Sequence, residues 1–441
     1  MKVAKFGGSS VADANQFRKV KQIIEADSDR QIVVVSAAGK SASERIKVTD
    51  FLIEMEQAIN DGNDFSKLFS KISSRILKIR DDLNLKLDIE ADLNEVAKHL
   101  NGCSHDYLIS RGEYLTGKMM AEFLGYYFVD AKDILIFDGD NLNYELSRQK
   151  LLTILQKHQN ILVPGFYGSN EEGSIHLMPR GGSDITGAIL ANLVDAQLYE
   201  NWTDVSGILM ADPRIVDHSK KIDVLTYEEL QELSYMGVGV FQEEAVRPVR
   251  QKNIPTEILN TNCPSAGGTL VVSKEKHLNN NIVTGIAGKK NYIVITIKKY
   301  RLSKHLEVLQ KVLAVFQKQH ISIDSTPSGN DGFSFLCQRG DVGDKSKLII
   351  QELKSNCGVD AVNVRENIAL VAAVSLKLSS RPAIAGRILN YLDESLIKVK
   401  FVFQDGSDIK VVFGVNNEDY EKTIEKIYHE SINSIAPKIS A

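Results

Sequence analysis

The sequence predicts an α/β protein in which a mostly parallel sheet sandwiched by helices is followed by two smaller βαββαβ units. Short apolar runs alternate with helical stretches in the first part of the chain, which is typical of a parallel sheet. A β-α-β-β-α-β order then occurs twice, at a period of about 75 residues. The 441 residues also exceed what one core usually serves.

The first strand is expected at 2–6, followed by a helix at 13–26 and a strand at 31–37. The core of the second strand, Ile32-Val33-Val34-Val35, is continuously apolar, as in a strand buried on both faces. Polar residues dominate 53–100, where Leu recurs at spacings of three and four, so we expect a helical layer over one edge or a lid. Further strands are expected at 134–137, 161–166, 196–201 and 256–259.

The pattern changes near the polar run 274–281, and the repeated units follow. The first round is expected as strand 292–297, helix 303–320, strands 321–325 and 332–338, helix 345–356 and strand 359–364. The second round is expected as strand 368–376, helix 382–394, strands 399–404 and 408–414, and helix 419–431. The position of its last strand is not predicted. This order is that of the ferredoxin-like fold, and its duplication indicates a regulatory module. We therefore expect domains at 1–280, 281–365 and 366–441.

Composition excludes several classes of protein. A net charge of -4 argues against a broad nucleic-acid surface. The chain lacks the ~20 consecutive apolar residues that would cross a bilayer, and Val3-Ala4-Lys5-Phe6 follows the start without an apolar signal region, so we expect a cytoplasmic, soluble protein. The four cysteines lie far apart without a Cys-x-x-Cys pair, which predicts free thiols and no metal site.

The first chemical motif is Lys5-Phe6-Gly7-Gly8-Ser9-Ser10, between the opening strand and a helix. Glycines let backbone amides approach an anion, the helix N-terminus adds partial positive charge, and Lys5 adds a full one. These features favour a phosphate cradle. The spacing is not that of a Walker loop, and a Gly-Gly pair after a strand is also typical of a plain turn.

Three further motifs contain side chains that could take part in binding or catalysis. Arg180-Gly181-Gly182-Ser183-Asp184 opens a helix, where the arginine could bind a carboxylate, although Arg180 and Asp184 could also merely cap a turn. Asn201-Trp202-Thr203-Asp204, continuing to Asp212-Pro213-Arg214, follows a strand and suits nucleotide binding, whereas Trp202 alone would suit a core. Glu113, in Ser110-Arg111-Gly112-Glu113, is expected to open a helix, where it could bind a substrate or only compensate the helix dipole.

Together these four motifs resemble the aspartate kinase family over essentially the whole chain, with the paired C-terminal units similar to ACT domains. The resemblance implies an amino acid kinase fold for about 1–280. It assigns Lys5, Gly7, Gly8 and Ser9, together with Thr203, Asp204 and Arg214, to ATP. It assigns Thr49, Glu113, Arg180 and Asp184 to aspartate, and makes Lys5 and Asp184 the catalytic residues.

The reaction that the resemblance implies is in-line attack by the β-carboxylate of aspartate on the γ-phosphorus of Mg²⁺-bound ATP, which needs no general base. It implies feedback by an amino acid, lysine rather than threonine, with Asp324 and Ser328 as effector contacts. It also implies a homodimer, or a dimer of dimers, through the ACT units.

Two stretches depart from the family pattern. Gly237-Val238-Gly239-Val240-Phe241-Gln242-Glu243 places Gly239 where the family usually has a nucleotide-contacting lysine, so ATP binding is weakened, or Arg250 or Lys252 replaces that contact. The loop Ser36-Ala37-Ala38-Gly39-Lys40-Ser41 is longer than usual before Thr49. Two other functions compete: an amino acid kinase acting on glutamate or carbamate, and a non-catalytic amino-acid sensor with a decayed kinase domain.

Overall fold

The computed structural model divides into two compact units. The first contains 1–208, 221–234 and 239–279, and the second contains 209–220, 235–238 and 280–441. The structure describes residues 1–42, 44–100, 102–239, 241, 243–273, 282–381, 383–404 and 406–433. Gln242 and the predicted boundary run 274–281 lie outside the described residues, so the boundary between 280 and 281 stays a prediction.

An eight-stranded sheet forms the centre of the first unit, in the order β10-β12-β11-β9-β1-β2-β6-β3. All neighbouring strands are parallel except β11 and β12, which confirms the mostly parallel sheet. The strands are β1 (Lys2–Phe6), β2 (Arg30–Val35), β3 (Tyr127–Phe128), β6 (Ile161–Pro164), β9 (Leu198–Thr203), β10 (Val224–Thr226), β11 (Thr256–Asn260) and β12 (Thr269–Val272).

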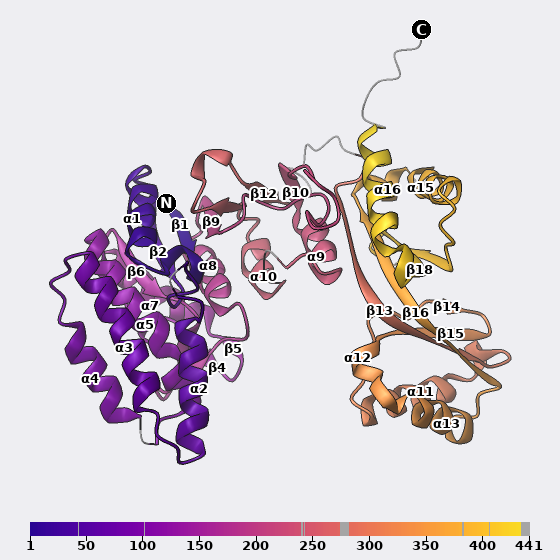
Figure 1. The fold of residues 1–441 in the computed structure, drawn as a ribbon, viewed down its shortest axis with the longest axis horizontal. Helices are drawn as coiled ribbons and strands as arrows, with labels where there is room; N and C mark the ends of the chain where they lie inside the picture. The colour runs from indigo at the N-terminus through magenta and orange to yellow at the C-terminus, as the bar shows by residue number, and fades with distance from the viewer. Residues whose placement is uncertain are drawn as a thin grey trace, which may run out of the picture. The chain divides into compact units, whose positions relative to one another are not determined.

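Helices cover both faces of this sheet (Figure 1). Ala4 and Phe6 of β1 point into a core that they share with five helices on one face. Because side chains alternate along a strand, Lys5 points to the other face, where α8 packs on β1. The five helices are α1 (Ala14–Glu25), α2 (Val48–Asn60), α3 (Ser66–Asp82), α4 (Ile89–His99) and α5 (His105–Leu124). The helices predicted for 53–100 are thus confirmed, but not their expected position over an edge or as a lid, because they pack on α1 and α5 on one face of the sheet.

A second, four-stranded sheet in the first unit has the order β5-β4-β7-β8. The strand expected at 134–137 is therefore only partly right, because α6 ends at Ile134 and β4 belongs to this small sheet. Its strands are β4 (Ile136–Asp138), β5 (Asn141–Leu142), β7 (Tyr167–Asn170) and β8 (Ile175–Leu177). The other helices of this unit are α6 (Ala131–Ile134), α7 (Tyr144–Leu155), α8 (Gly182–Leu193), α9 (Tyr227–Tyr235) and α10 (Glu243–Gln251).

The second unit is built on one antiparallel six-stranded sheet in the order β14-β15-β13-β16-β18-β17. Two strands of fourteen residues, β13 (Gly285–Lys298) and β16 (Ala361–Val374), run side by side through both halves of it (Figure 1). The other elements are β14 (Ser328–Gly329), β15 (Gly332–Gln338), β17 (Phe401–Gln404), β18 (Lys410–Asn416), α11 (Leu306–Lys318), α12 (Arg339–Val342), α13 (Ser346–Asn356), α14 (Lys377–Ser380), α15 (Ala383–Glu394) and α16 (Tyr420–Asn433).

The long strands differ from the sequence prediction in two ways. The strands expected at 359–364 and 368–376 are one strand, bent where Asn367 has a φ of 62°. Asn291, with a φ of 65°, marks the corresponding irregularity in β13, because asparagine tolerates left-handed backbone. The segment 321–325 is not a strand, and only Ser325 forms a bridge to Leu336. The first half of β13 pairs with the second half of β16. It is therefore the last strand of the second round, whose position the sequence did not predict.

Among the described residues, no helix combines the length and the apolar character needed to cross a bilayer. The four cysteines are free thiols, two buried, one half-buried and one exposed. Burial raises the pKa of Cys337 to about 12, so this thiol stays protonated inside its core.

Candidate active site

The candidate site lies where β1, β2 and β9 end at the same edge of the main sheet. The chain leaves β1 as Gly7, whose amide donates to the Trp202 carbonyl of β9 at 2.9 Å. It leaves β2 as the 36–39 loop, in which the Gly39 amide donates to the Gly8 carbonyl at 2.8 Å. Ligands of open α/β sheets bind beyond such carboxyl ends, so the fold places the first glycine motif where ligand chemistry is expected.

Lys5 and Asp184 meet at this edge. The Lys5 Nζ lies 2.5 Å from the Asp184 Oδ1, and both side chains are largely buried. The same carboxylate oxygen accepts from the Asn201 Nδ2 at 3.1 Å, because Asn201 pairs with Lys5 across neighbouring parallel strands. The structure therefore brings together the first, second and third motifs of the sequence analysis in one cluster.

Asn201 is a member of this cluster that its sequence motif does not single out. Its side-chain oxygen is buried without a hydrogen-bond partner, although a buried acceptor normally has one. The strand register facing Lys5 was the signal that could have found it. Asn201 thus offers an unused acceptor beside a lysine and a carboxylate.

Asp184 is held by the start of α8. Gly181, the residue before the helix, has a φ of 82°, a left-handed conformation that favours glycine. The Asp184 amide donates to the Gly181 carbonyl at 2.8 Å and so closes the first turn. Arg180 precedes this turn, is exposed, and forms no ion pair among the described residues. The turn-capping pair of Arg180 with Asp184 is therefore wrong: Asp184 pairs with Lys5 instead.

Glu113 lies in the interior of α5 rather than at its start, because α5 begins at His105 after the Ser104 cap. The expectation that Glu113 opens the helix and compensates its dipole is thus wrong. The Glu113 side chain is buried, its Oε2 has no partner, and the Ala37 amide donates to the carboxylate. Desolvation raises the pKa of Glu113 to about 7. Through its hydrogen bond with the Ala37 amide, the Glu113 side chain connects α5 with the 36–39 loop of the candidate site.

The remaining predicted residues lie at different places. Thr49 is half-buried in the first turn of α2, next to Val48, whose amide donates to the Ala38 carbonyl at 3.1 Å. Thr203 and the exposed Asp204 end β9, where the Thr203 hydroxyl donates to the Asp204 carboxylate at 3.2 Å. Arg214 belongs to the second unit and pairs with Asp212 at 2.6 Å. Trp202 is core and stacks on Phe6.

Neither cation considered as a substitute for the lysine missing at Gly239 is free. Lys252 donates to the Asn192 carbonyl and pairs with Asp195, and Arg250 pairs with Glu228. Gly239 itself is exposed, and a Cβ added there would meet no atom of the described residues within 4 Å. These residues therefore leave room for a side chain to start at this position.

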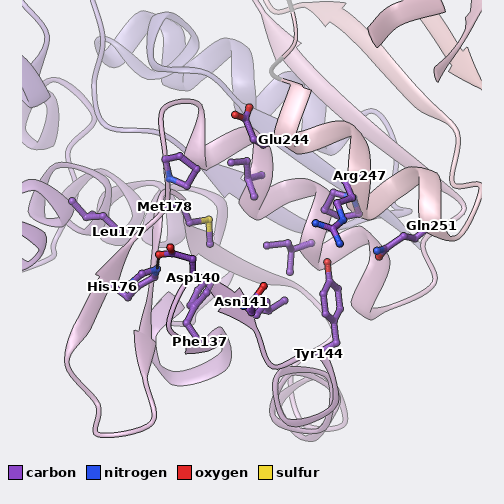
Figure 2. Close-up of a pocket in the computed structure, with 15 residues that line it drawn as sticks. Phe137, Asp140, Asn141, Tyr144, His176, Leu177, Met178, Glu244, Arg247 and Gln251 are labelled. Carbon is purple, nitrogen blue, oxygen red and sulfur yellow. Dashed lines mark ion pairs between the residues drawn. The ribbon is translucent and has the colours of Figure 1, made fainter. Parts of the chain in front are cut away.

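A cavity of about 640 Å³ adjoins α8 on its other side. Figure 2 shows Arg247, Tyr144 and Gln251 along one part of it, and His176, Asp140 and Met178 along another. The predicted site residues are not among those that line it. Met178 and Pro179 nevertheless lead directly into Arg180, so this cavity borders the second motif without containing it.

Comparisons with known proteins identify the family of this chain. Residues 1–260 match the model of the amino acid kinase family, and 371–430 match an ACT domain. Aspartokinase 3 of Bacillus subtilis (strain 168) is 33% identical over 454 residues, which cover 98% of both chains.

Solved structures give the same result. Clostridium acetobutylicum aspartate kinase has a TM-score of 0.90 and 40% identity, covering 97% of this chain and 99% of its own. E. coli aspartokinase III, solved in complex with aspartate and ADP, has a TM-score of 0.76 and 25% identity, covering 98% of this chain and 100% of its own. The chain therefore belongs to the aspartokinase family and is an aspartate kinase with an amino acid kinase region and a C-terminal ACT region.

Proposed function

We propose that this enzyme transfers the γ-phosphoryl group of ATP to the β-carboxylate of L-aspartate at the edge where β1, β2 and β9 end. The observation that carries the proposal is the cluster of Lys5, Asp184 and Asn201 beside the glycine loop. Aspartate and ADP in the structure of E. coli aspartokinase III support the choice of both substrates.

The reaction is an in-line displacement. A β-carboxylate oxygen forms a bond to the γ-phosphorus while the bond from that phosphorus to the bridging oxygen of ADP breaks. The nucleophile is already ionised at pH 7, so the protein supplies positioning and charge stabilisation rather than a base. Lys5 neutralises the transferring phosphoryl group, and the Gly7 and Gly8 backbone with Ser9 approaches the phosphates.

Aspartate is anchored by charges of both signs. Arg180, which is exposed and has no ion-pair partner among the described residues, binds the α-carboxylate through two parallel hydrogen bonds. Glu113 binds the ammonium group, since a nearby positive charge favours the ionised form of a carboxyl whose pKa burial has raised to about 7. Thr49 and Asp184 complete the aspartate site, and Thr203 and Asp204 contact the nucleotide.

Mg²⁺ fits this site as part of the nucleotide. The described residues hold no cluster of three metal-ligating side chains, but Mg²⁺ usually takes one or two carboxylates together with phosphate oxygens and water. Asp184 and Asp204 are carboxylates at the edge in question and would serve as such ligands. The ion would neutralise charge on the phosphates.

The test compares Lys5→Met with Lys2→Met on the same strand. Lys2 lies at the opposite end of β1, where it pairs with Asp27 and Glu200 and not with Asp184, so its loss leaves the pair of Lys5 and Asp184 in place. We expect Lys5→Met to lower kcat by about 10²–10³-fold in a coupled ADP-release assay with aspartate, and Lys2→Met to keep wild-type kcat. An active Lys5→Met enzyme would exclude the proposed role.

We further propose that lysine inhibits the enzyme at the second unit, as suggested by the structure of E. coli aspartokinase III in complex with lysine and aspartate. Asp324 and Ser328 are the proposed contacts. The Asp324 carboxylate accepts from the Tyr292 hydroxyl, and its carbonyl accepts from the Tyr235 hydroxyl. Ser328 lines a cavity of about 690 Å³ that does not include Asp324.

Inhibition curves decide between the effectors. Asp324→Ala should raise the lysine concentration for half-inhibition at least tenfold, since it removes a charged partner of the amino group, and leave uninhibited kcat unchanged. Threonine should inhibit neither protein. Unchanged lysine sensitivity in Asp324→Ala would place the effector elsewhere.

We also propose that two chains pair through their ACT regions, in a dimer or a dimer of dimers. Two edges of the six-stranded sheet, β14 and β17, carry unpaired backbone groups that a second copy could bond. Equilibrium ultracentrifugation with and without lysine should give at least a dimer. A monomer under both conditions would contradict this proposal.

A further inference from the structure

Arg75 is a buried arginine outside every motif of the sequence analysis. It lies in α3, within the helical layer, and only 6% of the residue is exposed. Among the described residues, no carboxylate lies within ion-pair distance of its guanidinium. Burying a charge is costly unless other polar groups satisfy it. The hydrogen-bond partners of the Arg75 guanidinium therefore indicate the role of this residue.

Those partners are three backbone carbonyls. The Nη1 donates to the Ile46 carbonyl at 2.7 Å, and the Nη2 donates to the Ala12 carbonyl at 3.1 Å and to the Gly39 carbonyl. Ala12 lies far from the other two residues in the sequence, whereas Gly39 and Ile46 belong to the one loop between β2 and α2. One side chain thus joins the turn after β1 to two points of that loop.

Each of these segments belongs to the candidate active site. Ala12 ends the short helical turn that follows Gly7. Gly39 belongs to the loop after β2, and its amide donates to the Gly8 carbonyl. Ile46 lies just before α2, whose first turn carries Thr49. Arg75 therefore ties the proposed phosphate loop to both segments that approach the proposed aspartate site.

The backbones of Gly8 and Gly39 are packed so closely that neither position has room for a side chain. A Cβ on Gly39 would lie 2.4 Å from the Gly8 carbonyl carbon, and one on Gly8 would lie 2.9 Å from the Ala37 oxygen. The two loops can touch only while their backbones keep this arrangement. A planar guanidinium can donate to several carbonyls at fixed angles, whereas a lysine ammonium is a compact point charge on a flexible stem.

We propose that Arg75 is a positioning residue for phosphoryl transfer, which holds the glycine loop, the 36–47 loop and the start of α2 in the arrangement that binds ATP and aspartate together. This inference rests on the proposed function of those loops. Arg75 acts through their backbone and does not touch the substrates.

The experiment measures kcat and both KM values for Arg75→Lys and Arg75→Ala, together with their melting temperatures. We expect Arg75→Lys to lower kcat/KM for ATP and for aspartate at least tenfold while the protein stays folded at the assay temperature. Millimolar guanidinium chloride should restore part of the activity of Arg75→Ala, and sodium chloride at equal concentration should not. Arg80→Met is the matched control: Arg80 lies on the same helix but pairs only with Asp81 and Glu90.

Each outcome decides the question. A lower melting temperature with wild-type kcat and KM in Arg75→Lys would overturn the proposal and leave a structural role. The same follows if Arg75→Lys and Arg80→Met lose equal activity. If Arg75→Ala does not fold, Arg75→Lys alone decides. The Lys5→Met comparison is a separate measurement, so the loop assignments and the role of Arg75 can fail independently.

Discussion

Glu113 is deeply buried, and its proposed role as the partner of the substrate ammonium requires a charged carboxylate. Burial raises the pKa of Glu113 from 4.5 to about 7, so between these values the folded protein retains a proton that the unfolded chain has released. The free energy of unfolding therefore falls as the pH rises through this window. Above pH 7 the full penalty is about 3 kcal/mol.

Glu113→Gln removes that penalty. We expect the variant to melt at a higher temperature than the wild type at pH 8, and at nearly the same temperature at pH 5, where Glu113 is neutral in the folded protein. Its KM for aspartate should rise at pH 8, because the substitution removes the proposed partner of the ammonium group. Thermal melts at both pH values provide the measurement, and an equal difference at pH 5 and pH 8 would contradict the assignment.

Gly239 offers a gain-of-function prediction at a single residue. Because a Cβ there would meet no atom of the described residues, Gly239→Lys should leave stability unchanged. It should lower the KM for ATP by about tenfold, the worth of one charge-assisted hydrogen bond. Gly239→Gln provides length without charge as a control. Steady-state kinetics at varied ATP would show the difference, and equal KM values in both variants would mean that this position does not face the phosphates.

Among the structural elements, the paired loops after β1 and β2 form the tightest part of the site. Gly39→Ala would force the 36–39 loop away from Gly8, so we expect at least a tenfold loss of kcat/KM with a minor change in far-UV circular dichroism. Gly386→Ala, in α15, meets open space and should stabilise its helix by up to about 1 kcal/mol. Wild-type activity in Gly39→Ala would show that the loops can separate without cost.

Local patterns predicted most elements of this chain, but not every partner. The strand expected at 31–37 and the helix expected at 13–26 are both confirmed by the structure, as β2 and α1. The glycine-rich motifs around Lys5 and Asp184 predict that both residues belong to the site, and the fold brings them together. Arg75 could not be found this way, because its three partners are carbonyls, which carry no side-chain signal.

The lengths of the strands are also difficult to predict from the sequence. Nothing local distinguishes two short strands from one long strand bent at an asparagine, so β16 was divided at Asn367. The start of α5 was also misplaced, since His105 to Ile109 have no strong helix-start pattern beyond Ser104. Such features depend on pairing with residues far along the chain.

At the scale of the whole molecule, each of the two units has a hydrophobic core of its own. Calorimetry of the full chain should therefore resolve two unfolding transitions. A ligand stabilises only the unit that binds it, so Mg-ATP with aspartate should raise one transition temperature and lysine the other. One transition that moves with either ligand would show that the units unfold together.

The pairing of β13 with β16 along their whole length has a consequence for how this protein can change over time. A stop codon near residue 366 would delete more than the second repeat, because it would remove half of β16 and leave the opening half of β13 without its neighbour. A chain that began at residue 292 would lack the first half of β13, so the second half of β16 would lose its partner strand. The sensor module can therefore be gained or lost only as a whole, and its two repeats cannot be inherited separately.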